Sequence, residues 1–151
     1  MTIALSGHGT KVARAKAATP TVFEDIAEMG DITFPGFTRN EFDAVTQNRN
    51  IDARVLGVLR RGPTTLALNF LPNDPTHDHL TGVMSAMITE PQPVDGYRFT
   101  FPTAAGASVW VMRGQVKAVD NIKTPVDGKM SADVTLVFSG LFTINGVVYG
   151  A

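Results

Sequence analysis

The sequence predicts a mainly β protein with one α-helix. Val, Thr and Ile together account for 40 of its 151 residues, and these β-branched side chains favour strands. The chain also has 14 glycines and 9 prolines to form turns, and apolar residues alternate with polar ones in several segments. A chain of this length is expected to form one domain with a core of its own.

The composition excludes several classes of protein. The formal net charge is −1 and the pI is about 6.3, whereas a general nucleic-acid-binding domain is usually strongly basic. Without cysteine the chain has no disulfide framework and no thiolate zinc site. It has neither an apolar run of about 18 residues, as a membrane span requires, nor the basic start of a signal peptide, so we expect a soluble cytoplasmic product. Charged residues make up only 18%, which favours a surface partly hidden in an assembly.

The first part of the chain differs from the rest in charge and pattern. Residues 1–20 predict an N-terminal arm, and residues 21–151 a single domain. The arm has no acidic residue and contains three bases, Lys11, Arg14 and Lys16. Val22 to Phe34 predicts a strand, a turn and a second strand. From Glu24 to Asp43 there are six acidic residues against one base, so charge is segregated between neighbouring segments.

A polar loop and two further strands follow. Thr46 to Asp52 is poor in core-forming residues and predicts a long exposed loop. Ala53 to Arg60 predicts a strand, and Arg60 to Pro63 a turn. Thr64 to Leu71 alternates between apolar and polar side chains and predicts a second strand, which we expect to pair with the preceding one.

The sequence predicts one helix, near residues 75–89. Asp74 can cap it, Pro75 suits its first position, and Asp78 lies near the positive end of the helix dipole. Prolines after residue 90 end it. Its apolar residues have helical spacing and predict a stripe that packs on a sheet or a neighbour, namely Leu80, Val83, Met84, Met87 and Ile88.

The remainder predicts long antiparallel strands. Side chains alternate from Tyr97 to Phe101 and again from Trp110 to Ala118. A third segment is expected to place five residues on one face, namely Val134, Leu136, Phe138, Gly140 and Phe142. The two longer strands are joined by Asp120 to Ser131, which contains an Asp127-Gly128 turn, so we expect one long hairpin.

Residues 74–79 form the only cluster that resembles a metal or acid–base site. His77 and His79 are two positions apart, about 200° on a helix, so they cannot share one ion. A helix start with exposed imidazoles is the favoured interpretation. No serine lies in a Gly-x-Ser-x-Gly elbow, and Gly7-His8-Gly9 does not open a phosphate-binding helix. We therefore predict a protein that is not an enzyme, with no catalytic, cofactor-binding or metal-binding residues.

Several short stretches carry a family resemblance. They are Phe23-Glu24-Asp25-Ile26, Gly30-Asp31-Ile32-Thr33, Arg39-Asn40-Glu41-Phe42-Asp43, Arg60-Arg61-Gly62 ahead of Leu66 to Phe70, and Trp110 to Val119 with Ser131 to Gly140. In their order and local sequence, from about Phe23 to Phe142, the chain resembles the tail tube (major tail) proteins of long, non-contractile-tailed bacteriophages.

The resemblance implies a β-sandwich or partly closed barrel flanked by one helix. It also implies a structural role in the virion tail, with assembly in the host cytoplasm. Hexameric rings would stack into a tube that conducts phage DNA from the capsid to the host cell without binding it specifically. Implied partners are further copies of the chain, a tape-measure protein, a tail terminator and baseplate or distal tail proteins. Cofactors and membranes have no part in it.

Other readings of the sequence remain. Within viral structure, the alternative is a head–tail connector or tail terminator, which forms a single ring and does not polymerise. Outside it, the alternatives are a soluble β-barrel binding module and a metal-dependent enzyme that uses residues 77–79.

Two sets of residues are candidates for roles in assembly. The arm and the polar loop supply candidates for contacts between rings, namely Lys11, Arg14, Lys16, Gln47, Asn48, Arg49, Asn50 and Asp52. A conduit for a polyanion should avoid bound phosphates, so its wall should be acidic or neutral. The candidates for the lumen are Glu24, Glu28, Asp133 and Thr135.

Overall fold

The computed structural model describes residues 6–16, 20–34, 36–45, 47, 51, 53–77, 88, 90–102 and 108–149. The described part of the chain is mostly β, as predicted. Its strands are β1 Lys11–Ala15, β2 Glu24–Asp25, β3 Met29–Thr33, β4 Phe37–Asp43, β5 Arg54–Arg61, β6 Thr64–Asn69, β7 Asp95–Thr100, β8 Val109–Lys123, β9 Ser131–Ile144 and β10 Val147–Tyr149.

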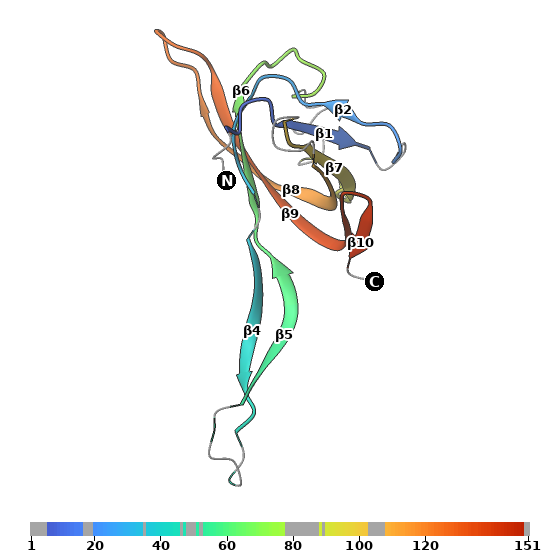
Figure 1. Ribbon diagram of the computed structural model, residues 1–151. Coiled ribbons are helices and arrows are strands. Elements are labelled where there is room, and N and C mark those ends of the chain that lie inside the picture. Colours follow the sequence, from blue (N-terminus) through green and yellow to red (C-terminus); the bar gives the residue numbers. More distant parts are fainter. Residues whose placement is uncertain are drawn as a thin grey trace.

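Most of these strands belong to one sheet, which forms the body of the molecule. Its order is β2-β1-β7-β8-β9-β6-β3. The last strand, β10, pairs with the C-terminal end of β9, past the residues that pair with β6. The sheet is open rather than closed into a barrel. The remaining strands, β4 and β5, form a separate two-stranded hairpin that projects away from the body (Figure 1).

The β8–β9 hairpin is the centre of the sheet, and the sequence predicted it. The two strands are 15 and 14 residues long and pair from Trp110↔Ile144 to Lys123↔Ser131. The predicted inward face of β9 is confirmed for Val134, Leu136, Phe138 and Phe142, which are all buried. Gly140 is exposed with a φ of 76° because the ladder shifts register there.

The core lies against one face of this sheet. In β6 and β7 every second residue is buried, as alternation predicts. Fully buried side chains include Leu66, Tyr97, Phe99, Met112 and Leu136. Burial of each large apolar side chain contributes about 1.5–3 kcal/mol, so this layer supplies most of the favourable free energy of folding.

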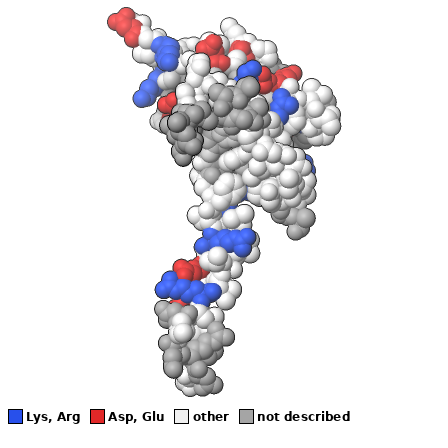
Figure 2. Space-filling model, viewed as in Figure 1, with Lys and Arg blue, Asp and Glu red and all other residues white. Residues whose placement is uncertain are grey.

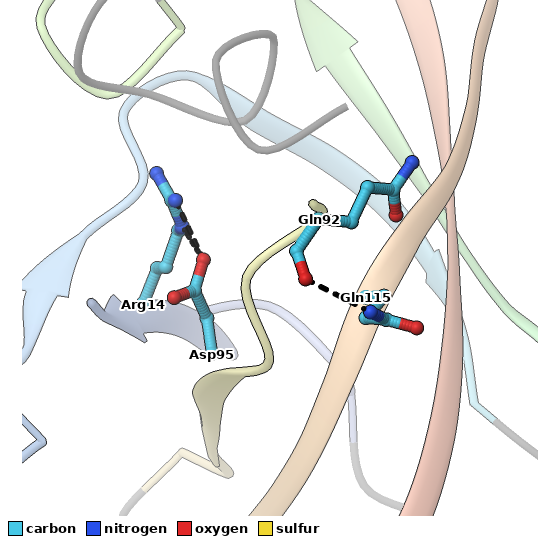
Figure 3. A network of polar contacts seen from close by, with 4 residues as sticks. All are labelled: Arg14, Gln92, Asp95 and Gln115. Atoms are coloured by element: carbon cyan, nitrogen blue, oxygen red, sulfur yellow. Dashed lines mark hydrogen bonds and ion pairs between the residues drawn. The ribbon is translucent and has the colours of Figure 1, made fainter. Parts of the chain in front are cut away.

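Residues 11–15 were expected in an arm, and the structure instead places them in the sheet as β1. This strand pairs with β7 along its full length, and only Lys11 is exposed. The Arg14 side chain is 9% exposed, and its Nε and Nη2 donate to Oδ2 of Asp95 at 2.8 and 2.6 Å (Figure 3). Arg14, one of the predicted contacts between rings, is therefore largely buried, and its charge is paired with Asp95 inside the body.

The strand predicted from Ala53 to Arg60 was expected to pair with the strand from Thr64 to Leu71, and this expectation is wrong. β5 pairs with β4, whereas β6 pairs with β9 and β3. The amide of Gly62 donates to the carbonyl of Gly36 at 2.8 Å and ends the β4–β5 ladder. Beyond that point the chain enters the body, where the apolar face of β6 is covered by the core.

Most of the expected helix lies outside the described residues. This holds for Leu80, Val83, Met84 and Met87 of the apolar stripe, whereas Ile88 is described as helical and exposed. Among the described residues, no helix is long and apolar enough to cross a membrane.

His77 was expected to be exposed, and the structure buries it. Its Nδ1 accepts the Leu71 amide at 3.1 Å, and its Nε2 lies 2.7 Å from the carbonyl oxygen of Ala27. These contacts define a neutral ring that carries its hydrogen on Nε2. The ring also stacks on Phe70. His77 thus fixes the segment after β6 to the turn before β3.

Candidate assembly interface

The β4–β5 hairpin is the most unusual feature of the molecule. All seven residues of β4 are exposed, and in β5 only Gly57 and Arg61 are half-buried. The ribbon extends well beyond the sheet (Figure 1). An isolated two-stranded hairpin is at best marginally stable in water. Its exposed faces therefore favour a role that covers them.

Large apolar side chains lie along both strands of the hairpin without cover. Val58 is 78% exposed and Leu56 is 61% exposed. The other exposed members are Phe37, Phe42, Val55 and Leu59, with Val45 and Ile51 beyond the strands. Contiguous apolar surface of this kind marks an interaction site in soluble proteins. We identify this apolar hairpin surface as the candidate assembly interface.

A register shift shapes the hairpin midway along its length. Asn40 of β4 lies opposite two residues of β5, Gly57 and Val58. The ring of Phe42 crosses over Gly57, where an added Cβ would lie 2.8 Å from Cε2 of the ring. Gly57 thus leaves room for the ring of Phe42, which pairs across the strands with Val55. A larger residue at position 57 would displace this ring.

The root of the hairpin is fixed to the body by aromatic and cationic contacts. Phe37 lies 5.8 Å from Phe142 and 6.3 Å from Trp110, measured between ring centroids. The guanidinium of Arg61 lies 4.7 Å above the Phe142 ring, and its Nη2 donates to the carbonyl of Gly140 at 2.7 Å. These contacts give the ribbon a defined direction relative to the sheet.

A groove of about 640 Å³ lies beside this root. Its lining residues come from the hairpin and from β9 and β10, namely Arg39, Val58, Leu59, Arg60, Arg61, Phe138, Ser139, Gly140, Phe142 and Tyr149. Burial lowers the pKa of Arg61, and its Nη1 is buried with no hydrogen-bond partner in the described structure. The groove therefore combines an apolar floor with arginine side chains.

The predicted contact residues have different positions. Lys11 is exposed on β1, Lys16 is half-buried just beyond it, and Gln47 is exposed at the hairpin end. Asn48, Arg49, Asn50 and Asp52 lie outside the described residues. Sequence reasoning missed the apolar hairpin surface, because residues such as Val55 and Leu59 suggest a buried strand when read alone.

The predicted lumen residues belong to separate parts of the sheet. Glu24 and Glu28 are exposed on and after β2, the edge strand. Asp133 and Thr135 are half-buried on β9, where Asp133 accepts a hydrogen bond from Asn121 at 3.0 Å.

The residues that suggested a metal site do not form one in the described structure. Asp74 accepts hydrogen bonds from the amide and hydroxyl of Thr76, and these bonds lower the pKa of its carboxyl. Asp78 and His79 lie outside the described residues. Among the residues that are described, no group of three or more His, Asp or Glu side chains could hold a metal ion.

Comparison with known proteins identifies the fold. No protein-family model matches this sequence, and no curated protein matches it in sequence. Solved structures do match. A chain of the anti-feeding prophage baseplate, solved with six-fold symmetry, has a TM-score of 0.71 at 12% identity and covers 97% of this chain and 99% of that one.

Two further structures extend the comparison. A chain from the sheath/tube terminator of an extracellular contractile injection system has a TM-score of 0.70 at 10% identity, covering 98% of both chains. The SPP1 tail tube has a TM-score of 0.69 at 10% identity, covering 97% of this chain and 82% of that one. The chain thus has the fold of phage tail and injection-system tube components.

The expected tail tube fold is therefore confirmed. Because the matched structures include both a phage tail tube and contractile systems, the fold is common to these classes.

Proposed function

We propose that this protein is a structural subunit of a virion tail, in which hexameric rings stack into a tube that conducts DNA from the capsid to the host cell. The β4–β5 hairpin carries the proposal, because a ribbon with Val58 and Leu56 largely in water is explained by burial against neighbouring copies. Similarity to tail and injection-system components supports the same role.

Stacking would use the far end of the hairpin. Gln47 lies there, and the other loop candidates are its sequence neighbours. Contacts repeated around a ring form in parallel, which makes stacking cooperative even where each contact is weak. Because the conduit must let DNA pass, we expect its wall to be acidic or neutral. Tape-measure, terminator and baseplate proteins would contact the ends of the tube. The role requires no catalysis and no cofactor.

The test compares a double substitution in the hairpin with a single control substitution in purified protein. L56S/V58S removes apolar surface from the hairpin and should prevent rings or tubes, as judged by negative-stain imaging and sedimentation. The control is V126S. Val126 is 100% exposed, and it lies in the connection between β8 and β9 rather than in the β4–β5 hairpin. Parent protein that stays monomeric at high concentration, even with tail initiation components added, would contradict the proposal.

A single-ring connector or terminator is the second candidate function. The match to a chain from a sheath/tube terminator structure favours it. The same images separate the two candidates, since a terminator gives single rings whereas a tube subunit gives stacks.

A further inference from the structure

Two parts of the described chain differ in charge. Residues 20–34, which contain β2 and β3, carry four acidic residues and no Lys or Arg. Strands β4 and β5 carry four arginines against Glu41 and Asp43, a net charge of +2. Figure 2 shows the hairpin arginines as two bands, whereas β2 lies on the body, away from the hairpin (Figure 1).

Among the described residues, only one hairpin arginine forms an ion pair. Arg54 donates to Glu41 at 2.7 Å, and both side chains are exposed. The other three, Arg39, Arg60 and Arg61, line the groove at the hairpin root, and no acidic residue of the described chain lines it with them. The groove thus presents guanidinium donors above the apolar side chains of β9.

We propose that this groove binds the acidic β2–β3 segment of a second copy of the chain. The inference rests on the proposed function and names the surfaces that join one copy to the next. Arginine favours carboxylates because its planar donors can bind both oxygens. β2 is the edge strand of the sheet, and its residues Glu24 and Asp25 are both exposed, so they are accessible to a neighbour.

The arrangement predicts a contact that propagates. The groove and the acidic segment are different surfaces, so each copy offers one to the next and keeps the other. Such a head-to-tail contact produces a ring when the rotation from copy to copy closes, and an open stack when it does not. A duplex nucleic acid is the other polyanion that could enter an arginine groove, but the chain as a whole has a net charge of −1.

Charge exchange tests the proposal. R39E/R60E reverses the charge of two groove residues, whereas Arg61, which contacts the body, is retained. E24K/D25K reverses the charge of two residues in the proposed partner segment. Each double variant should raise the protein concentration needed for assembly by more than about tenfold, because attraction becomes repulsion, and the quadruple variant should restore assembly. K123E/K129E is the matched control, since both lysines are exposed in and beyond the end of β8. Thermal melts establish that each variant is folded.

The outcomes separate this inference from the proposed function. Tubes formed by R39E/R60E at the parent's concentration would overturn the groove contact and leave self-assembly intact. A quadruple variant no better than either double would also overturn it. Loss of duplex DNA binding by R39E/R60E, with assembly unchanged, would identify nucleic acid as the occupant instead. Parent protein that never assembles would overturn both proposals.

Discussion

Removal of the buried carboxylate of Asp95 should cost much of the stability of the body. Asp95 is 1% exposed, and two nitrogens of Arg14 donate to its Oδ2 at 2.6 and 2.8 Å. Breaking a buried ion pair on one side costs about 3–5 kcal/mol, because the remaining charge stays in a region of low dielectric. Tyr97 beside the pair is fully buried, and this burial raises the pKa of its hydroxyl. D95A should therefore reduce the free energy of unfolding by a large part of the ~5–15 kcal/mol that is typical of a domain.

Urea denaturation of the unassembled protein measures this loss. With a slope of about 2 kcal/mol per M, the midpoint should fall by about 1.5–2.5 M. K11A is the control, because Lys11 is the exposed residue of the same strand and its loss should change stability by less than about 0.5 kcal/mol. R14M/D95L should recover part of the loss, since it removes both charges. A midpoint for D95A within about 0.3 M of the parent would refute the inference that β1 is held by a buried ion pair.

Three further predictions concern substitutions in the body of the molecule. G114A should lower the free energy of unfolding by at least about 1–3 kcal/mol, because the added Cβ would lie 2.4 Å from the carbonyl oxygen of Val137. Thermal melting measures this loss. H77A should lose about 1–3 kcal/mol in urea denaturation, because the Leu71 amide loses its acceptor and the Ala27 carbonyl loses its donor. D74A should cost about 1 kcal/mol at neutral pH, because it removes the acceptor of the Thr76 amide and hydroxyl. Because hydrogen bonds lower the folded-state pKa of Asp74, its contribution is present above the unfolded value of about 3.9 and is lost as the pH falls through the lower folded value. Parent and D74A should therefore converge in acid, as measured by urea midpoints across that range.

The site was less accessible to sequence reasoning than the fold. The polar loop at residues 46–52 was predicted from its polarity and lies mostly outside the described residues, and the acidic segment was predicted from its composition. The apolar surface of β4 and β5 was not, because Val55, Leu56 and Val58 have the composition of any core strand. Arg14 and Lys11 also could not be distinguished, because both are basic residues of the same segment. Only Arg14 faces a buried carboxylate, which lies 81 residues further along the chain.

The sequence by itself determined that β5 to β9 are strands and, in several of them, which face is apolar. Alternation along β6, β7 and β9 is a local property of the extended chain, so it can be predicted without knowing any partner. Only the tertiary structure decided what covers each face. β5 and β6 follow one another and are both rich in apolar residues, but long-range pairing places β6 between β3 and β9 and leaves β5 with β4 alone. Burial depends on neighbours that are distant in sequence, which is why the same kind of strand forms core in one place and an open surface in the other.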